Sequence, residues 1–164
     1  MSVLTPLEGL RLGMLGQRVE KASAILPATT TQDLFTVAGG RVLVTSLVGE
    51  VTVVFDGTVN SLNVLADPTV GAAANLCAAT VCTSDAAGTL YTVSGIQADL
   101  LGSQKAGGTE VPSHAVARIM PGAAGFVVHE GKIQLNATAT DTTGSTAWTI
   151  TYIPYDAGAT VVSA

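Results

Sequence analysis

Charged side chains are scarce in this sequence. They make up 12% of its 164 residues, against about 25% in an average soluble domain. Only seven residues are Lys or Arg, and they are scattered along the chain, whereas nucleic-acid binding needs clustered cations to contact the phosphates. The net charge of −5 and the pI near 4.7 oppose such binding as well. The sequence therefore predicts a protein that does not bind nucleic acid.

Long apolar runs are also missing, and none reaches the roughly 18 residues that a membrane-spanning helix needs. The N-terminal stretch MSVLTPLEGLRLGMLGQRVEK lacks the basic start of a signal peptide, and Glu8 and Arg11 interrupt its apolar run. We therefore expect synthesis in the cytoplasm and no membrane partner. The mean hydropathy is nevertheless +0.48, which points to apolar surface hidden inside the fold or inside an assembly.

Cysteine and aromatic residues are few. Cys77 and Cys82 do not have the spacing of a zinc pair, and no second pair completes four ligands. We expect two buried free thiols; a disulfide requires a turn that joins them. Aromatic residues make up 4% of the chain. Trp148, Tyr152 and Tyr155 are candidates for a small stacking platform, but alternation along the strand favours a core position for the first two.

Catalytic patterns are absent from the sequence. Its only two histidines, His114 and His129, lie beside strand-like runs. No Gly-x-Ser-x-Gly elbow, phosphate-binding glycine loop or closely spaced carboxylate pair accompanies them. We predict that the protein is not an enzyme and that it holds neither a metal nor a cofactor.

Small and β-branched residues dominate what is present: 24 Ala, 22 Thr, 20 Val and 18 Gly. This composition favours pleated sheets and tight turns over helices. We predict an all-β protein, a single-domain antiparallel β-sandwich or jelly-roll-like barrel over residues 17–164. Residues 1–16 form an extended N-terminal arm, in which glycines disfavour a helix. Its large apolar residues need cover from this domain or from a neighbour: Leu4, Leu7, Leu10, Leu12, Met14 and Leu15.

The most apolar part of the chain is GGRVLVTSLVGEVTVVF, residues 39–55. Its apolar residues occur at both even and odd positions, whereas a strand with one wet face alternates. Val42 and Val44 have one parity, and Leu47 and Val51 have the other. The pattern predicts either a strand covered on both faces or a hairpin that folds back at Gly49 and Glu50.

Several further strands and turns are expected on each side of this run. They are a polar edge strand over 17–26, a short strand over 34–37, a two-residue hairpin turn at Asp56-Gly57, an amphipathic strand over 59–65, strands over 76–81 and 89–93, and a long surface loop over 95–113. In the last third, Ile133, Leu135, Ala137 and Ala139 share one strand face, and Trp148, Ile150 and Tyr152 share another. We expect these two strands to form a hairpin.

Three segments give the sequence a resemblance to a known class. They are ASAILPATTTQDLFTVAGGRVLVTSLVGEVT, GTLYTVSG and WTITYIPYDAGATVVSA, and the similarity covers about residues 22–58, 88–94 and 146–164. They resemble small virion proteins of tailed bacteriophages, of the type that decorates or cements the head. The resemblance implies a non-enzymatic structural protein on the capsid surface, made in the bacterial cytoplasm.

The resemblance also implies partners. These are the major capsid protein and further copies of this chain, as a homotrimer, and the apolar residues of the arm are the candidate contacts with the capsid or with a neighbouring subunit. Two alternatives stay open at this point: a subunit of the tail or neck, and a carbohydrate-binding module on the virion surface that uses the 95–113 loop and the region of Tyr155.

Overall fold

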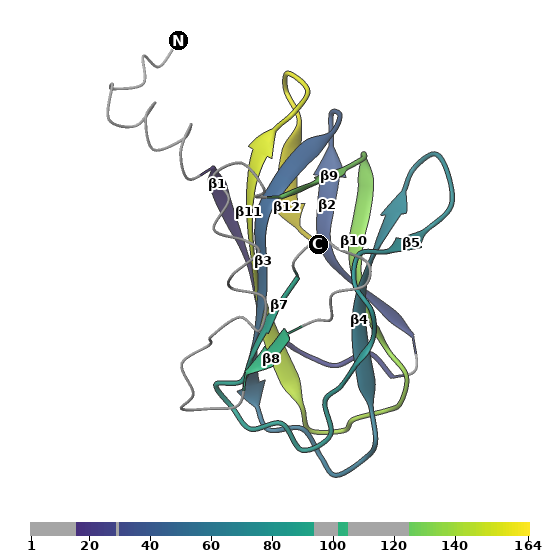
Figure 1. Ribbon diagram of the computed structural model, residues 1–164, viewed down its shortest axis with the longest axis vertical. Coiled ribbons are helices and arrows are strands. Elements are labelled where there is room, and N and C mark those ends of the chain that lie inside the picture. Colours follow the sequence, from purple (N-terminus) through teal and green to yellow (C-terminus); the bar gives the residue numbers. More distant parts are fainter. Residues whose placement is uncertain (1–15, 29, 94–101, 105–124) are drawn as a thin grey trace, which may run out of the picture.

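The computed structural model describes residues 16–28, 30–93, 102–104 and 125–164, and these contain strands and no helix (Figure 1). The strands form two antiparallel sheets packed as a sandwich, which confirms the predicted fold class. The N-terminal arm, with its six candidate contact residues, lies outside the described residues.

The first sheet, sheet A, has the order β1-β11-β3-β7-β8, and β9 also pairs with β3. Its strands are β1 (Gln17–Ile25), β3 (Val42–Val53), β7 (Leu90–Thr92), β8 (Gly102–Gln104), β9 (Phe126–Val128) and β11 (Ser145–Pro154). β1 is an edge strand, as its polar sequence predicts. β7 and β9 pair with different parts of the same side of β3, so together they extend the sheet beyond that long strand.

The second sheet, sheet B, has the order β12-β2-β10-β4-β5, and β6 also pairs with β4. Its strands are β2 (Thr31–Ala38), β4 (Ser61–Pro68), β5 (Ala74–Asn75), β6 (Thr80–Val81), β10 (Gly131–Ala137) and β12 (Thr160–Ser163). Figure 1 shows sheet A on the left, with sheet B behind and to the right of it.

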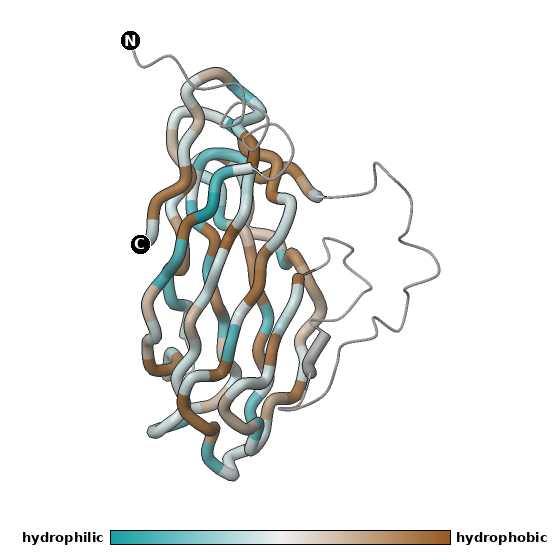
Figure 2. The backbone as a smooth tube through the Cα atoms, turned by 90° about the vertical axis from the view of Figure 1, so that its left-hand side faces the viewer, coloured by the Kyte–Doolittle hydropathy of each residue, from teal (hydrophilic) through white to brown (hydrophobic). Residues whose placement is uncertain are grey.

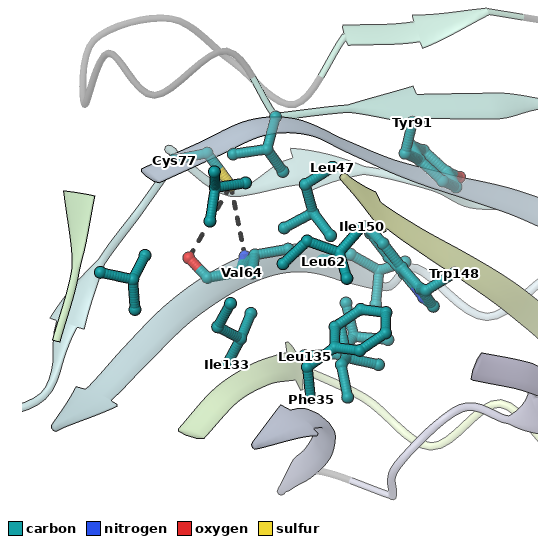
Figure 3. Packing of buried hydrophobic residues seen from close by; sticks show 14 of the residues in the cluster. Phe35, Leu47, Leu62, Val64, Cys77, Tyr91, Ile133, Leu135, Trp148 and Ile150 are labelled. Carbon is teal, nitrogen blue, oxygen red and sulfur yellow. Dashed lines mark hydrogen bonds between the residues drawn. The ribbon is translucent and has the colours of Figure 1, made fainter. Parts of the chain in front are cut away.

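The core lies between the two sheets and combines one face of each. Trp148, Ile150 and Tyr152 of β11 are buried there, as the alternation along their strand predicts. Ile133 and Leu135 of β10 come from the opposite sheet, with further large side chains around them (Figure 3). Burying each large apolar side chain contributes about 1.5–3 kcal/mol, so this layer dominates the stability of the sandwich.

The mixed parity of residues 39–55 comes from irregularities in one continuous strand. In β3, Val44 pairs with Tyr152 and Ser46 pairs with Thr151, so Thr45 is an extra residue that changes the parity of the buried side chains. Val42 and Val44 therefore point into the core before this bulge, as Leu47 and Val51 do after it: all four are buried. The hairpin expectation is wrong, because β3 continues through Gly49. Within the chain itself the outer side of β3 is partly exposed, so cover on both faces stays a prediction about an assembly.

Two predicted hairpins are also wrong. Asp56-Gly57 connects β3 of sheet A with β4 of sheet B, and residues 138–144 connect β10 of sheet B with β11 of sheet A. Hydrogen bonds tie the two connections together: the Asp56 main-chain N–H donates to Asp141 Oδ2 at 2.9 Å, and the Thr142 N–H donates to Asp56 Oδ2 at 3.3 Å. These side chains stabilise crossings between the sheets where turn composition alone indicates hairpins.

The predicted strand over 76–81 is divided into separate pieces. β5 and β6 each pair with β4, and between them the chain turns Cys77 into the core. The strand predicted over 89–93 is confirmed as β7. Most of the predicted 95–113 loop lies outside the described residues, but Gly102–Gln104 within it forms β8, which pairs with β7.

Candidate interaction surface

The inner strands of sheet A carry little charge on their outward side. The strands β3, β7, β9 and β11 contain one charged residue between them, Glu50. No further strand or helix of the described part of the chain covers this face, which Figure 2 views from its own side. The charged residues of the sheet gather instead on its edge strand β1, where Arg18 pairs with Glu20.

Strand pairing places apolar residues in rows across this face. Leu43 of β3 pairs with Ile153 of β11 on one side and with Val127 of β9 on the other. Their chain neighbours Val42 and Val128 are buried, so these three side chains point away from the core. Val127 is 44% exposed. The row lies at the end of the sheet where β1 begins.

Two further rows complete the surface. In the middle of the face, Val48 pairs with Thr149 of β11 and with Thr92 of β7. At the far end, Ser145 pairs with Ile25 and Val53, which are 60% and 45% exposed. We call this whole area, the outward side of β11, β3, β7 and β9 with Ile25 at its corner, the sheet A face. It combines aliphatic side chains and threonine hydroxyls on a broad sheet, which is suited to packing against another protein surface.

The outer face of sheet B is polar and bonded within itself. Asp33 of β2 accepts hydrogen bonds from Lys132 Nζ at 2.5 Å and from Gln134 Nε2 at 2.6 Å. The Lys132 hydrogen bond in particular lowers the pKa of Asp33. Beside them, Asn136 donates to Asn63 and Asn63 donates to Asn75, each at 2.9 Å. The polar groups of this face therefore satisfy one another.

Arg41 organises one end of the sandwich. Its Nε and Nη2 donate to the two carboxylate oxygens of Asp156 at 2.9 and 2.8 Å, and its main-chain N–H donates to Oδ2 at 2.8 Å. These bonds lower the pKa of Asp156 to about 2. The Arg41 guanidinium also lies 4.8 Å from the centre of the Tyr155 ring. The arrangement clamps the β2–β3 turn to the β11–β12 turn.

The predicted aromatic platform does not form. Trp148 and Tyr152 are core residues, and Tyr155 alone of the three is exposed. Its ring is in contact with Arg41, which belongs to the clamp between the two turns. One exposed ring gives a sugar little to stack on, so this end of the molecule lacks the paired aromatics expected of a carbohydrate site.

Buried acids at the opposite end have structural partners. Asp141 accepts hydrogen bonds from the main-chain N–H groups of Asp56, Thr143 and Gly144. Asp85 accepts the hydroxyl of Tyr91 at 2.5 Å, and burial together with this bond raises the pKa of the Tyr91 phenol. Within the described residues, no three His, Cys, Asp or Glu side chains come together to hold a metal ion.

Both cysteines are buried free thiols, as predicted. Cys77 Sγ accepts the Val64 N–H at 3.2 Å and Cys82 Sγ donates to the Asn60 carbonyl at 3.4 Å (the Cys77 pair is shown in Figure 3). Burial raises the pKa of both thiols, that of Cys82 to about 12. They act as core residues and are poor nucleophiles in the folded protein.

The structure does not bring the sequence-predicted chemistry together. His129 is exposed after β9, while His114 lies outside the described residues. The sequence analysis missed the sheet A face, although its signal is readable: β11, STAWTITYIP, has no charged residue at all. The sequence does not show that β3 and β11 pair, and this pairing joins two strands of low charge into one surface.

Comparison with known proteins adds no relative. No protein-family model, curated protein or solved structure matches this chain. The described residues include no helix long and apolar enough to cross a membrane.

Proposed function

We propose that this protein is a structural subunit of a tailed-phage virion, which binds the outer surface of the head and cements the mature capsid. It acts by association and not by catalysis, its partner is the major capsid protein, and its place is the capsid surface. The observation that carries the proposal is the sheet A face, a surface of aliphatic and threonine side chains whose strands carry one charged residue, Glu50. The resemblance of three sequence segments to head decoration proteins supports it further.

The physical task of such a subunit is to favour one state of the capsid lattice. A protein that binds the mature lattice and not its precursor stabilises the mature form in proportion to its binding free energy. This requires a rigid body and an apolar contact surface, and it requires no catalytic group. The N-terminal arm supplies a second contact, through the six large apolar residues named above.

Immunogold electron microscopy of the virion that encodes this chain tests the assignment. We expect gold particles over the whole head surface. Label confined to the tail or to the neck would replace the head assignment with the alternative structural role. Absence of label from intact virions, with the protein present in the infected cell, would overturn a virion role altogether.

The arm is tested by deletion of residues 2–15. Gly16 is retained because it is tightly packed: a Cβ at this position would lie 2.6 Å from the Tyr152 carbonyl oxygen. We expect the truncated protein to melt as the full chain does and to lose its binding to mature heads in a pelleting assay. Undiminished binding would show that the arm is not a capsid contact.

A further inference from the structure

We propose that residues 94–124 are an insertion into one strand of sheet A, and that the sandwich folds without them. The inference goes beyond the proposed function, because it concerns which part of the chain the fold requires and does not depend on a capsid. It rests on the pairing of β7 and β9 with β3 and on the core residues at the two ends of the insertion.

β7 and β9 share one strand position beside β3 (Figure 1). Both are antiparallel to β3 and lie on the side of it that β11 does not occupy, so they run in the same direction. Just after β7, the Val93 N–H donates to the Leu47 carbonyl oxygen at 3.0 Å. β9 begins with Phe126 opposite Val44. The chain therefore leaves a strand at Val93 and resumes it at Phe126.

The two ends of the insertion lie close together. Only two residues of β3 separate Leu47 from Val44, so at ~3.3 Å per residue the positions that face Val93 and Phe126 are about 10 Å apart. An uninterrupted strand would cross this distance with two residues. Gly125, which precedes β9, has a φ of +120°, and a Cβ on it would overlap the Val44 carbonyl oxygen. The return to the strand is thus fixed at a position that requires glycine.

The core is filled from both sides of the insertion. Tyr91 and Val93 are buried at the end where the chain leaves the strand. Val128 is buried at the other end, and Phe126 packs against the same core cluster. Every second residue of a strand points to one side, so these four side chains form the inward row that a single continuous strand would supply.

β8 is the one described strand inside the insertion. It is the last strand in the order of sheet A, and it pairs with β7. Its removal leaves in place all the pairings that join β3 to β11, β7 and β9. Shortening the connection between two fixed ends also lowers the entropy cost of closing it. The loss of one short edge pairing is therefore the main cost that we expect from deleting the insertion.

Thermal unfolding of shortened chains tests the inference. In one version a Gly-Ser dipeptide replaces residues 94–124 and joins Val93 to Gly125. A second version has a longer Gly/Ser linker, so that strain in the short linker does not decide the result. We expect cooperative unfolding with a midpoint within about 5 °C of that of the full chain. Loss of the cooperative transition in both versions would overturn the inference.

Val128→Asp in the longer-linker version is the matched control. Val128 is 3% exposed, and a buried carboxylate without a partner should abolish the cooperative transition if β9 keeps its place in the shortened chain. A shortened chain that tolerates V128D would show that β9 no longer belongs to the core, and this would overturn the inference as well. Neither result bears on the head assignment, which immunogold labelling tests separately.

Discussion

At the residue scale, Gly49 shows how one missing side chain shapes the core. It is buried on β3, and it pairs with Trp148 on one side and with Tyr91 on the other. A Cβ at this position would lie 2.7 Å from Cζ2 of the Trp148 ring. Trp148 is 1% exposed, so its ring is packed on all sides. The glycine is therefore required by packing between two aromatic side chains.

Gly49→Ala should destabilise the fold by about 1–3 kcal/mol, the usual cost of overfilling a packed core. Urea denaturation followed by Trp148 fluorescence measures this. Gly57→Ala is the matched control, since nothing lies within 4 Å of its Cβ position, and it should change the stability by less than about 0.5 kcal/mol. Equal effects of the two substitutions would contradict the packing account.

Asp156 makes stability depend on pH. Its pKa is about 2 in the folded protein, against an ordinary value of 3.8, because Arg41 donates hydrogen bonds to the carboxylate. A carboxyl whose pKa is lowered on folding stabilises the protein above its unfolded pKa, and this contribution is lost as the pH falls through the folded pKa. The relevant window therefore runs from about pH 4 down to about pH 2.

Comparison of the wild type with Asp156→Asn isolates this contribution. The wild type should have the higher urea midpoint at neutral pH, and the difference should shrink between about pH 4 and pH 2. Other acids, such as Asp33, titrate in both proteins, so they cancel in the difference to first order. A difference that persists unchanged below that window would rule out the Arg41 hydrogen bonds as its cause.

At the element scale, the sequence predicts which side of a strand is buried better than it predicts which strands pair. Alternation correctly placed Ile133 and Leu135, with Trp148 and Ile150, in the core, because the side chains of a strand point to its two sides in turn. It could not show that the two strands belong to different sheets. The composition of a turn is local, whereas the Asp56 and Asp141 bonds that hold the crossings join residues 85 apart in the chain.

The crossing at Asp141 should be sensitive to its charge. The carboxylate accepts main-chain N–H groups on both oxygens, so Asp141→Asn turns an amide N–H₂ toward a donor. We expect a loss of about 1–3 kcal/mol in the free energy of unfolding, measured by urea denaturation. Thr140→Asn, at the exposed neighbouring residue, is the control and should be close to neutral. A neutral D141N would mean that the crossing is held by packing alone.

The bulge in β3 is a feature that the sequence does not predict. Its bulge at Thr45 has no composition signal, because threonine suits a regular strand equally well. The bulge nevertheless decides which apolar residues reach the core and which remain on the sheet A face. The sequence of each strand shows that it has few charged residues. The size of the sheet A face depends on which strands pair, and only the fold shows that. The candidate contacts in the arm stay a prediction.

At the scale of the whole molecule, the two sides of the sandwich differ in kind. Sheet B presents polar groups that bond to one another, as Asp33 does with Lys132 and Gln134. Strands β3 and β11 of sheet A present aliphatic and threonine side chains with one carboxylate, Glu50, while the charged pair Arg18 and Glu20 lies on the edge strand β1. This asymmetry is what a subunit needs if it is to face a partner on one side and solvent on the other, and it supports the proposed role on the virion.

The cementing role itself is tested most directly by the heat stability of mature heads. Heads that lack this protein are heated with and without a saturating amount of the purified chain, and release of the genome is followed with a DNA-binding dye. We predict that the release temperature rises as the protein is added and reaches a plateau at a fixed number of copies per capsid subunit, because binding to the intact lattice stabilises it. An unchanged release temperature, on heads to which the protein is shown to bind, would contradict the account.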